Sequence, residues 1–163
     1  MGEFKPSCLP VELVSNPVFL LGKLGYGLKR QAAEELEDAG YSLYDYSVLS
    51  LLAEGPCATQ ATIADMLQLD RSQLVAELDG LEQRGLVERR RDPNDRRRHT
   101  VLLTEEGTRH LEHVRAIVKE IADAYLSPLD AEERATLHRL LLRVASHHDA
   151  RFAITSSVAE QVA

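Results

Sequence analysis

The chain has 163 residues, of which 44% are hydrophobic and 28% are charged, and its formal net charge is −7. These values are typical of one compact globular domain or two small ones. No apolar stretch approaches the roughly 20 residues of a membrane-spanning helix, so we expect no membrane partner. The N-terminal residues lack the features of a secretory signal, so we expect a cytoplasmic protein. Two cysteines, Cys8 and Cys57, are too few for a disulfide scaffold or a zinc site made of four thiolates.

The basic charge is concentrated in residues 84–98. This segment holds seven arginines against three acids, a net charge of +4, so the rest of the chain carries −11. A basic patch on an acidic body is typical of a protein that meets a polyanion through one edge. A solvated arginine-rich loop is the alternative for a charge run taken alone.

Caps and helix breakers predict two helices in the first third of the chain. The first spans about residues 17–38, because Pro17 is typical of a first turn and Gly40 of a helix end. The second begins at Ser42 and ends at Gly55, with leucines and tyrosines at helical spacing between them.

The next two helices are short and closely joined. Thr59 can cap the third helix, and Asp70 with Gln73 has the pattern of a capping box that opens the fourth. Only residues 68–69 separate the third helix from the Asp70 cap, and Gly85 ends the fourth. The fourth helix turns three leucines toward the core: Leu74, Leu78 and Leu81. Two helices joined so tightly form a helix-turn-helix motif.

A short β-hairpin is predicted after the fourth helix. Residues 86–90 and 99–103 have extended patterns, and the turn sequence 92–95 lies between them. Because arginines occur on both arms and at the tip, the hairpin is interpreted as a DNA-binding wing.

Two longer helices follow the hairpin. The fifth begins at Thr104 and ends before Ser127, and Asp130 with Glu133 forms a capping box that opens the sixth. The first, fifth and sixth helices have apolar stripes that lack a partner in a small winged-helix core, which predicts a two-fold homodimer. An intramolecular helical bundle is the alternative.

The face of the fourth helix opposite its leucines is predicted to read DNA. Its side chains are mostly small or carry amides: Ser72, Gln73, Ala76, Asp79, Gly80 and Gln83. Gln73 can pair with adenine, Ser72 can bind a base or a phosphate, and Ala76 can contact a thymine methyl group. Arg71 can reach a phosphate or a guanine edge. Phosphates repel the Asp79 carboxylate, so we expect it to pair with an arginine of the wing or its strands.

The tip of the wing is predicted to enter the minor groove. Arg97 is the expected probe, because a guanidinium fits the negative potential of a narrow groove, and Asp95 can hold it extended. At the base of the hairpin, alternate arginine side chains face either the duplex or the protein. The expected DNA-contacting residues are Thr59, Gln60, Arg71, Ser72, Gln73, Ala76, Arg89, Asp95, Arg96, Arg97 and Arg98.

Three segments resemble the signature of the multiple-antibiotic-resistance regulator (MarR) family. They are residues 81–89, 92–97 and 101–107, which read LEQRGLVER, DPNDRR and VLLTEEG. The helix order matches as well, over about residues 17–148. The resemblance implies a winged-helix dimer whose first, fifth and sixth helices form the interface and whose fourth helix enters the major groove. It also implies a repressor that leaves its pseudo-palindromic site when a small phenolic or amphipathic effector binds.

The same resemblance assigns roles to single positions. Asp95 and Arg97 match the family's wing aspartate and minor-groove arginine, and Asp79 matches the aspartate of its recognition helix. Two positions depart from the family pattern, because Ala76 and Gly80 stand where arginine is frequent. We therefore expect the major-groove contacts to be weaker or to read another sequence.

Tyrosines are the candidate lining of an effector pocket. Four of the five lie around the first and second helices: Tyr26, Tyr41, Tyr44 and Tyr46. Amphipathic rings can line a cleft for a small aromatic or amphipathic effector. Packing within the lobe is the equally weighted alternative.

Other sensing chemistries and catalysis have weaker support. Neither Cys8 nor Cys57 has an evident neighbouring cation or base in the sequence that would activate it as a redox sensor. His110 with His113, and the pair 147–148, supply fewer ligands than zinc needs. Motifs for phosphate binding, a nucleophile elbow or metal catalysis are lacking, so we expect no enzyme, metal or cofactor.

These observations predict a mainly α fold with a small β-hairpin wing. We expect an N-terminal arm and dimerisation helix (1–40), a winged helix-turn-helix lobe (41–104), C-terminal dimerisation helices (105–148) and an unassigned tail (149–163). The predicted function is sequence-specific binding of double-stranded DNA by a homodimeric, ligand-responsive repressor. The alternative is a helical-dimer interaction module or antirepressor with a vestigial winged helix.

Overall fold

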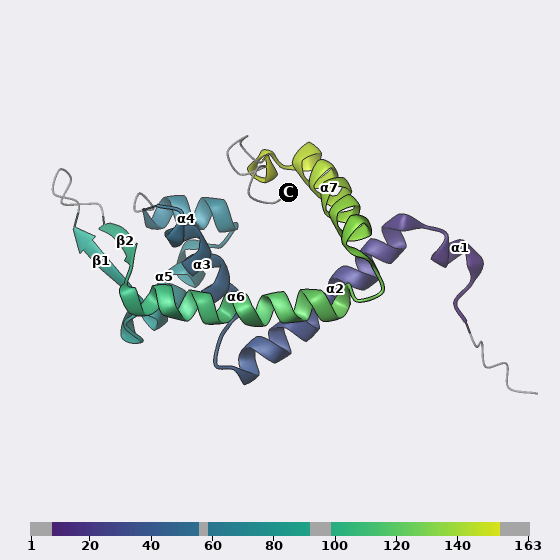
Figure 1. Cartoon of the computed structure of the whole chain (residues 1–163). Helices are drawn as coiled ribbons and strands as arrows, with labels where there is room; N and C mark the ends of the chain where they lie inside the picture. The colour runs from purple at the N-terminus through teal and green to yellow at the C-terminus, as the bar shows by residue number, and fades with distance from the viewer. Residues whose placement is uncertain (1–7, 56–58, 92–98, 154–163) are drawn as a thin grey trace, which may run out of the picture. The chain divides into compact units, whose positions relative to one another are not determined.

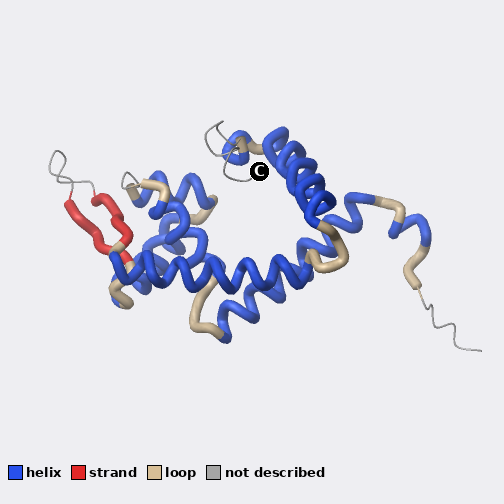
Figure 2. The backbone as a smooth tube through the Cα atoms, viewed as in Figure 1, coloured by secondary structure: helices blue, strands red, loops and turns tan. Residues whose placement is uncertain are grey.

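The computed structural model describes residues 8–55, 59–91 and 99–153. It is mainly helical with one antiparallel hairpin, as predicted (Figures 1 and 2). The elements are α1 (Val11–Val14), α2 (Pro17–Asp38), α3 (Leu43–Ala53), α4 (Gln60–Leu67), α5 (Arg71–Gln83), β1 (Val87–Arg91), β2 (His99–Leu103), α6 (Glu105–Tyr125), α7 (Ala131–His148) and the 3-10 turn η1 (Ala150–Phe152). Contacts group the chain into two units, residues 1–43 and 44–163. No described helix is long and apolar enough to cross a membrane.

In the first unit, α2 has the predicted bounds and ends. The Asn16 side chain accepts hydrogen bonds from the backbone N–H groups of Val18 and Phe19, which satisfies two donors at the helix start. At the other end Gly40 adopts φ +80°, and the Tyr41 N–H donates to the Leu36 carbonyl at 2.8 Å. A residue in the left-handed region at this position is a common helix terminator, and glycine adopts it without strain.

The helix-turn-helix motif forms from α4 and α5. Thr59 caps α4 through a bond from the Thr62 N–H, and Gln68 ends it in the left-handed conformation with φ +53°. Asp70 then caps α5, accepting the Gln73 N–H at 2.8 Å. Gly85, with φ +71°, closes α5. Short-range side-chain and backbone bonds therefore set both helices and the turn between them.

The β1–β2 hairpin pairs Val87 with Leu103 at its base and Arg91 with His99 at its last described pair. Val87 and Val101 are buried, so the base of the hairpin belongs to the core of the lobe. An isolated bridge joins Thr59 to Thr100, so the start of α4 pairs with β2. Residues 92–98, between the strands, lie outside the described residues.

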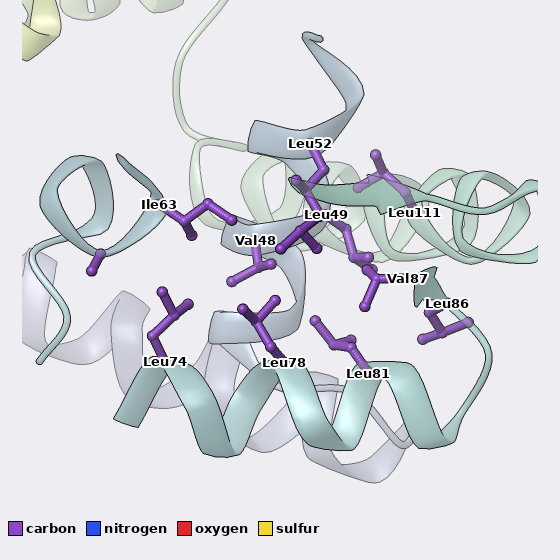
Figure 3. Close-up of a cluster of buried hydrophobic side chains, with 12 residues drawn as sticks. Val48, Leu49, Leu52, Ile63, Leu74, Leu78, Leu81, Leu86, Val87 and Leu111 are labelled. Carbon is purple, nitrogen blue, oxygen red and sulfur yellow. The ribbon is translucent and has the colours of Figure 1, made fainter. Parts of the chain in front are cut away.

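The hydrophobic core of the lobe is formed by α3, α4, α5, the hairpin base and the first half of α6 (Figure 3). Leu74, Leu78 and Leu81 point from α5 toward Val48 and Leu49 of α3, and all five side chains are at most 1% exposed. Burial of one such side chain contributes roughly 1.5–3 kcal/mol. The predicted inward face of α5 is confirmed.

A close contact sets the start of α6. The Thr104 hydroxyl donates to the Gly85 carbonyl at 2.7 Å and also accepts the Gly107 N–H at 2.9 Å as the helix cap. A Cβ atom added to Gly107 would lie 2.0 Å from the Leu86 carbonyl oxygen. Only glycine allows α6 to start this close to Leu86, the residue before β1.

The α7 helix begins with the predicted capping box between Asp130 and Glu133. None of its residues is buried, and Leu140, Leu141 and Val144 are 39–53% exposed. In the first unit α2 also exposes apolar side chains: Val18, Leu20, Leu21 and Leu24. Two helices predicted to dimerise thus present apolar side chains to solvent in the single chain.

Two short elements were not predicted, α1 and η1. In η1 the Arg151 guanidinium pairs with the Asp149 carboxylate and donates to the backbone carbonyls of Asp65 and Met66, both at 3.1 Å. These carbonyls lie at the C-terminal end of α4, where helix carbonyls lack partners within the helix. The first part of the unassigned tail therefore caps the first helix of the helix-turn-helix motif.

Candidate nucleic-acid interface

The exposed face of α5 is the centre of the candidate interface. Arg71, Ser72 and Ala76 are exposed, and Gln73 is half-buried. Ser72 and Ala76 lie on the side of the helix opposite its buried leucines, with Gln73 at the edge of that side, whereas Arg71 lies beside Leu74 on the flank toward α4. These short side chains let the helix backbone approach a duplex closely, while amide, hydroxyl and guanidinium groups supply hydrogen bonds to base edges or phosphates.

The first turn of α5 is held by the Asp70 carboxylate. The Ser72 hydroxyl donates to one of its oxygens, and so does the Gln73 backbone N–H. These two bonds, the hydroxyl bond being the stronger cause, lower the pKa of Asp70. The ionised cap thereby fixes the backbone on which Ser72 and Gln73 are presented.

The start of α4 lies beside the start of α5. Gln60, Ala61, Arg71, Leu74 and Val75 line a groove of about 270 Å³ between the two helices. Thr59 is half-buried, and its hydroxyl is occupied with the cap of α4. Gln60 and Arg71, both expected to contact DNA, thus line the same groove, whereas the Thr59 hydroxyl serves the local fold.

Arg89 faces the protein, which is one of the two alternatives left open for arginines at the hairpin base. Its Nη1 atom lies 2.5 Å from an Asp79 oxygen and 3.1 Å from a Glu82 oxygen. Its backbone N–H also donates to Glu82, and its side chain is only 19% exposed. The expected partner of Asp79 is confirmed. Because both carboxylates occupy the guanidinium, we assign Arg89 to fixing β1 against α5 in place of the expected direct DNA contact.

The outer arm of the wing is basic. Arg90 and Arg91 are exposed on β1, and Arg90 pairs with Glu88 of the same strand. The predicted tip residues all lie outside the described residues: Asp95, Arg96, Arg97 and Arg98. Their roles remain predictions from the sequence.

A cluster that the sequence analysis missed joins three helices of the lobe. Arg84, the residue that caps α5, donates to Asp45 of α3 at 2.7 Å and lies 2.7 Å from the His110 Nε2 atom of α6. Asp45 is 4% exposed, the only buried charged residue among those described. Glu77 lies nearby, and its pKa is raised mainly by burial and also by the Asp45 charge. A carboxylate in the first turn of an otherwise apolar helix was the available signal.

The candidate effector tyrosines differ in burial. Tyr26 of α2 is 74% exposed and Tyr44 of α3 is 40% exposed, whereas Tyr41 is half-buried. Tyr46 packs against the hydrophobic core of the lobe. Tyr46 thus packs within the lobe, which was the alternative to a ligand-lining role. A ligand-lining role for the other three tyrosines remains a prediction.

The other candidate sensors have no ligand-binding geometry in the described ranges. Cys8 is exposed, and Cys57 lies outside those ranges. His147 and His148 contact each other edge to face, with ring centroids 5.1 Å apart. No group of three or more metal-binding side chains comes together among the described residues.

Comparison with known proteins places these features in a family context. The MarR family model matches residues 42–99, which run from the start of α3 to the start of β2. The putative transcriptional regulatory protein for the hcr operon of Thauera aromatica is 30% identical over 133 residues, covering 77% of this chain and 80% of that protein.

Two solved structures show relatives with partners bound. The transcriptional repressor CouR bound to a 23-mer DNA duplex is 30% identical, with a TM-score of 0.74 over 85% of this chain and 99% of CouR. CouR from Rhodococcus jostii RHA1 bound to p-coumaroyl-CoA is 29% identical, with a TM-score of 0.70 over 90% and 99% of the two chains. The fold seen here thus occurs in proteins that bind DNA and a small molecule.

Proposed function

Since the chain belongs to the MarR family of transcriptional regulators, which are not enzymes, we propose that it is a homodimeric, ligand-responsive repressor of a pseudo-palindromic operator. The observation that carries this proposal is the exposed face of α5, whose small and amide side chains project from a helix fixed by three buried leucines. The structure of CouR on DNA supports the same use of the fold.

In this proposal α5 reads the major groove. Ser72, Gln73 and Ala76 contact base edges. Arg71 and Gln60, which line the protein groove between α4 and α5, contact the sugar-phosphate backbone of the DNA. Because no arginine stands at positions 76 and 80, specificity depends on hydrogen bonds from amide and hydroxyl groups more than on charge. Arg97 enters the minor groove, braced by Asp95, and Arg96 and Arg98 bind phosphates.

The dimer brings two recognition helices to one duplex. Exposed apolar residues on α2 and α7 supply surface for a second copy, and burying them removes apolar area from water. A two-fold dimer presents its helices to half-sites about one helical turn, or roughly 10 bp, apart. Binding therefore requires the pair, since each copy supplies one half of the contacts.

The proposed effector is a small aromatic or amphipathic molecule. The complex of CouR with p-coumaroyl-CoA supports this class, and Tyr26, Tyr41 and Tyr44 are the candidate ligand-lining residues. Release from DNA requires that the effector binds more tightly to a dimer whose recognition helices do not match adjacent major grooves. The affinity lost for DNA cannot exceed that difference in effector binding.

The test is binding of the full chain to DNA flanking its own gene and to a duplex selected from a random library. We expect a dimer–duplex complex that weakens steeply with salt, because arginine–phosphate contacts release counterions. Arg97→Ala should cost about 1–3 kcal/mol per half-site. Arg109→Ala, an exposed arginine on the side of α6 opposite Leu111, should leave affinity unchanged.

Two results would reject the proposal. A monomer at working concentrations, or a dimer that ignores duplex DNA at low ionic strength, would favour the interaction-module alternative. Full affinity of the Arg97→Ala dimer would remove the wing from the DNA-binding mechanism. Addition of candidate phenolic ligands to the complex tests effector release in the same assay.

A further inference from the structure

One guanidinium group joins the C-terminal end of the recognition helix to two other helices. Arg84 Nη1 donates to Asp45 Oδ2 at 2.7 Å, and Arg84 Nη2 lies 2.7 Å from His110 Nε2. Asp45 belongs to the first turn of α3, and His110 to the first third of α6. The Asp45 side chain is 6% exposed and that of Arg84 is 38% exposed, so the contact lies partly inside the lobe.

The chemistry of this contact fixes the state of the histidine. A guanidinium group only donates hydrogen bonds, so His110 Nε2 must accept, and the ring must be neutral with its proton on Nδ1. Partial burial, and next the charge of Arg84, hold the pKa of His110 below its usual value of 6.5. Protonation would remove the acceptor and place a second cation beside Arg84.

We propose that His110 is a positioning residue for DNA binding, whose neutral ring fixes Arg84 and thereby the C-terminal end of the recognition helix against α6. This inference rests on the proposed use of α5 as the DNA-reading helix. It gives α6, a helix expected at the dimer interface, a direct connection to α5. A displacement of α6 moves the acceptor that holds Arg84, so the end of α5 follows.

The charged groups around His110 determine how the contact responds to acid. Arg84 of α5 and His113 of α6 lower the pKa of His110, whereas Asp45 of α3 and Glu106 of α6 raise it. The net effect lowers the pKa of His110. The bond between Arg84 and His110 is therefore intact at neutral pH and is lost as pH falls through a value under 6.5. The contribution of His110 to DNA affinity should disappear over the same range.

The experiment compares His110→Gln with the wild-type chain. Glutamine keeps an acceptor oxygen but does not titrate. The affinity of the variant for DNA should therefore not show the loss at acid pH that the neutral-to-charged change of His110 causes in the wild type. The measured quantity is the ratio of wild-type to variant affinity for a duplex selected by the wild type, from about pH 8 to about pH 5. Any effect of pH on groups other than His110 is shared by both proteins, and the ratio removes it. We expect the ratio to fall on the order of tenfold, the scale of the loss of one hydrogen bond to a charged group.

Two further variants complete the test. His110→Lys carries a permanent cation and should bind the duplex weakly at every pH while remaining folded by circular dichroism. The control His138→Gln, exposed on α7, should keep the wild-type pH profile. A constant ratio for His110→Gln, or wild-type affinity for a folded His110→Lys, overturns the inference. Failure of the wild type to bind any duplex would instead overturn the proposed function.

Discussion

Replacing Gly107 with alanine tests whether the close approach at the start of α6 holds the lobe together. The new Cβ atom would lie 2.0 Å from the Leu86 carbonyl oxygen and 2.8 Å from the Leu103 Cδ1 atom. The leucine side chain can rotate away, but the carbonyl cannot, because it accepts the backbone N–H of Thr104 at 3.1 Å. Relief of the clash therefore requires the helix start to move.

The size of the effect follows from the contacts that such a movement disturbs. Overpacking a close-packed site costs about 1–3 kcal/mol. Loss of the cap bond from the Gly107 N–H to Thr104 adds about 1 kcal/mol. Alanine has a higher helix propensity than glycine, which returns about 1 kcal/mol. We therefore expect the free energy of unfolding to fall by about 2 kcal/mol, which lowers Tm by about 4–8 °C in a protein of this size.

The assay is denaturant and thermal unfolding of the wild type, Gly107→Ala and a control, Gly80→Ala. Gly80 lies in the middle of α5 with no atom within 4 Å of an added Cβ. Alanine there should raise the free energy of unfolding by about 1 kcal/mol. The reasoning is refuted if Gly107→Ala is as stable as the wild type, since the same substitution would then be tolerated against a backbone oxygen.

Two other changes test the interface and the tail. Gln73→Ala should broaden the set of duplexes selected from a random library while changing nonspecific affinity little, because Gln73 is assigned to base edges; an unchanged selection would contradict that role. The Asp149 pKa is lowered to about 2, mainly by the bond from the Arg151 side chain, so its carboxylate stabilises the fold fully above 3.8. The difference in free energy of unfolding between wild type and Asp149→Asn should be constant above pH 3.8 and shrink as pH falls toward about 2. A difference that stays constant at every pH would show that the ion pair with Arg151 contributes nothing to stability.

The parts of the fold set by short-range signals could be predicted from the sequence. Gly40 and Gly85 end helices with positive φ, and Asp130 forms its capping box with Glu133, as their patterns indicated. Each of these features depends on residues within one turn of one another, so the sequence pattern contains the whole interaction. The inward leucines of α5 follow from helical periodicity in the same way.

The side-chain partnerships between distant segments could not be predicted. Arg84 meets residues 39 positions before it and 26 positions after it, and Arg151 meets a carbonyl 86 positions away. Arg89 had two possible orientations at the hairpin base, and only the packing of β1 beside Asp79 and Glu82 selects the inward one. A sequence pattern shows which charges are available but not which of them the fold brings together.

The Arg151 contact has a practical consequence for work with this protein. Since Arg151 caps the C-terminal end of α4, residues 149–153 contribute to the helix-turn-helix structure. An affinity tag or fluorescent reporter joined directly after residue 153 would disturb the hydrogen bonds from Arg151 to the carbonyl groups of Asp65 and Met66. Fusions are better placed ahead of α1, where the described chain begins with exposed residues.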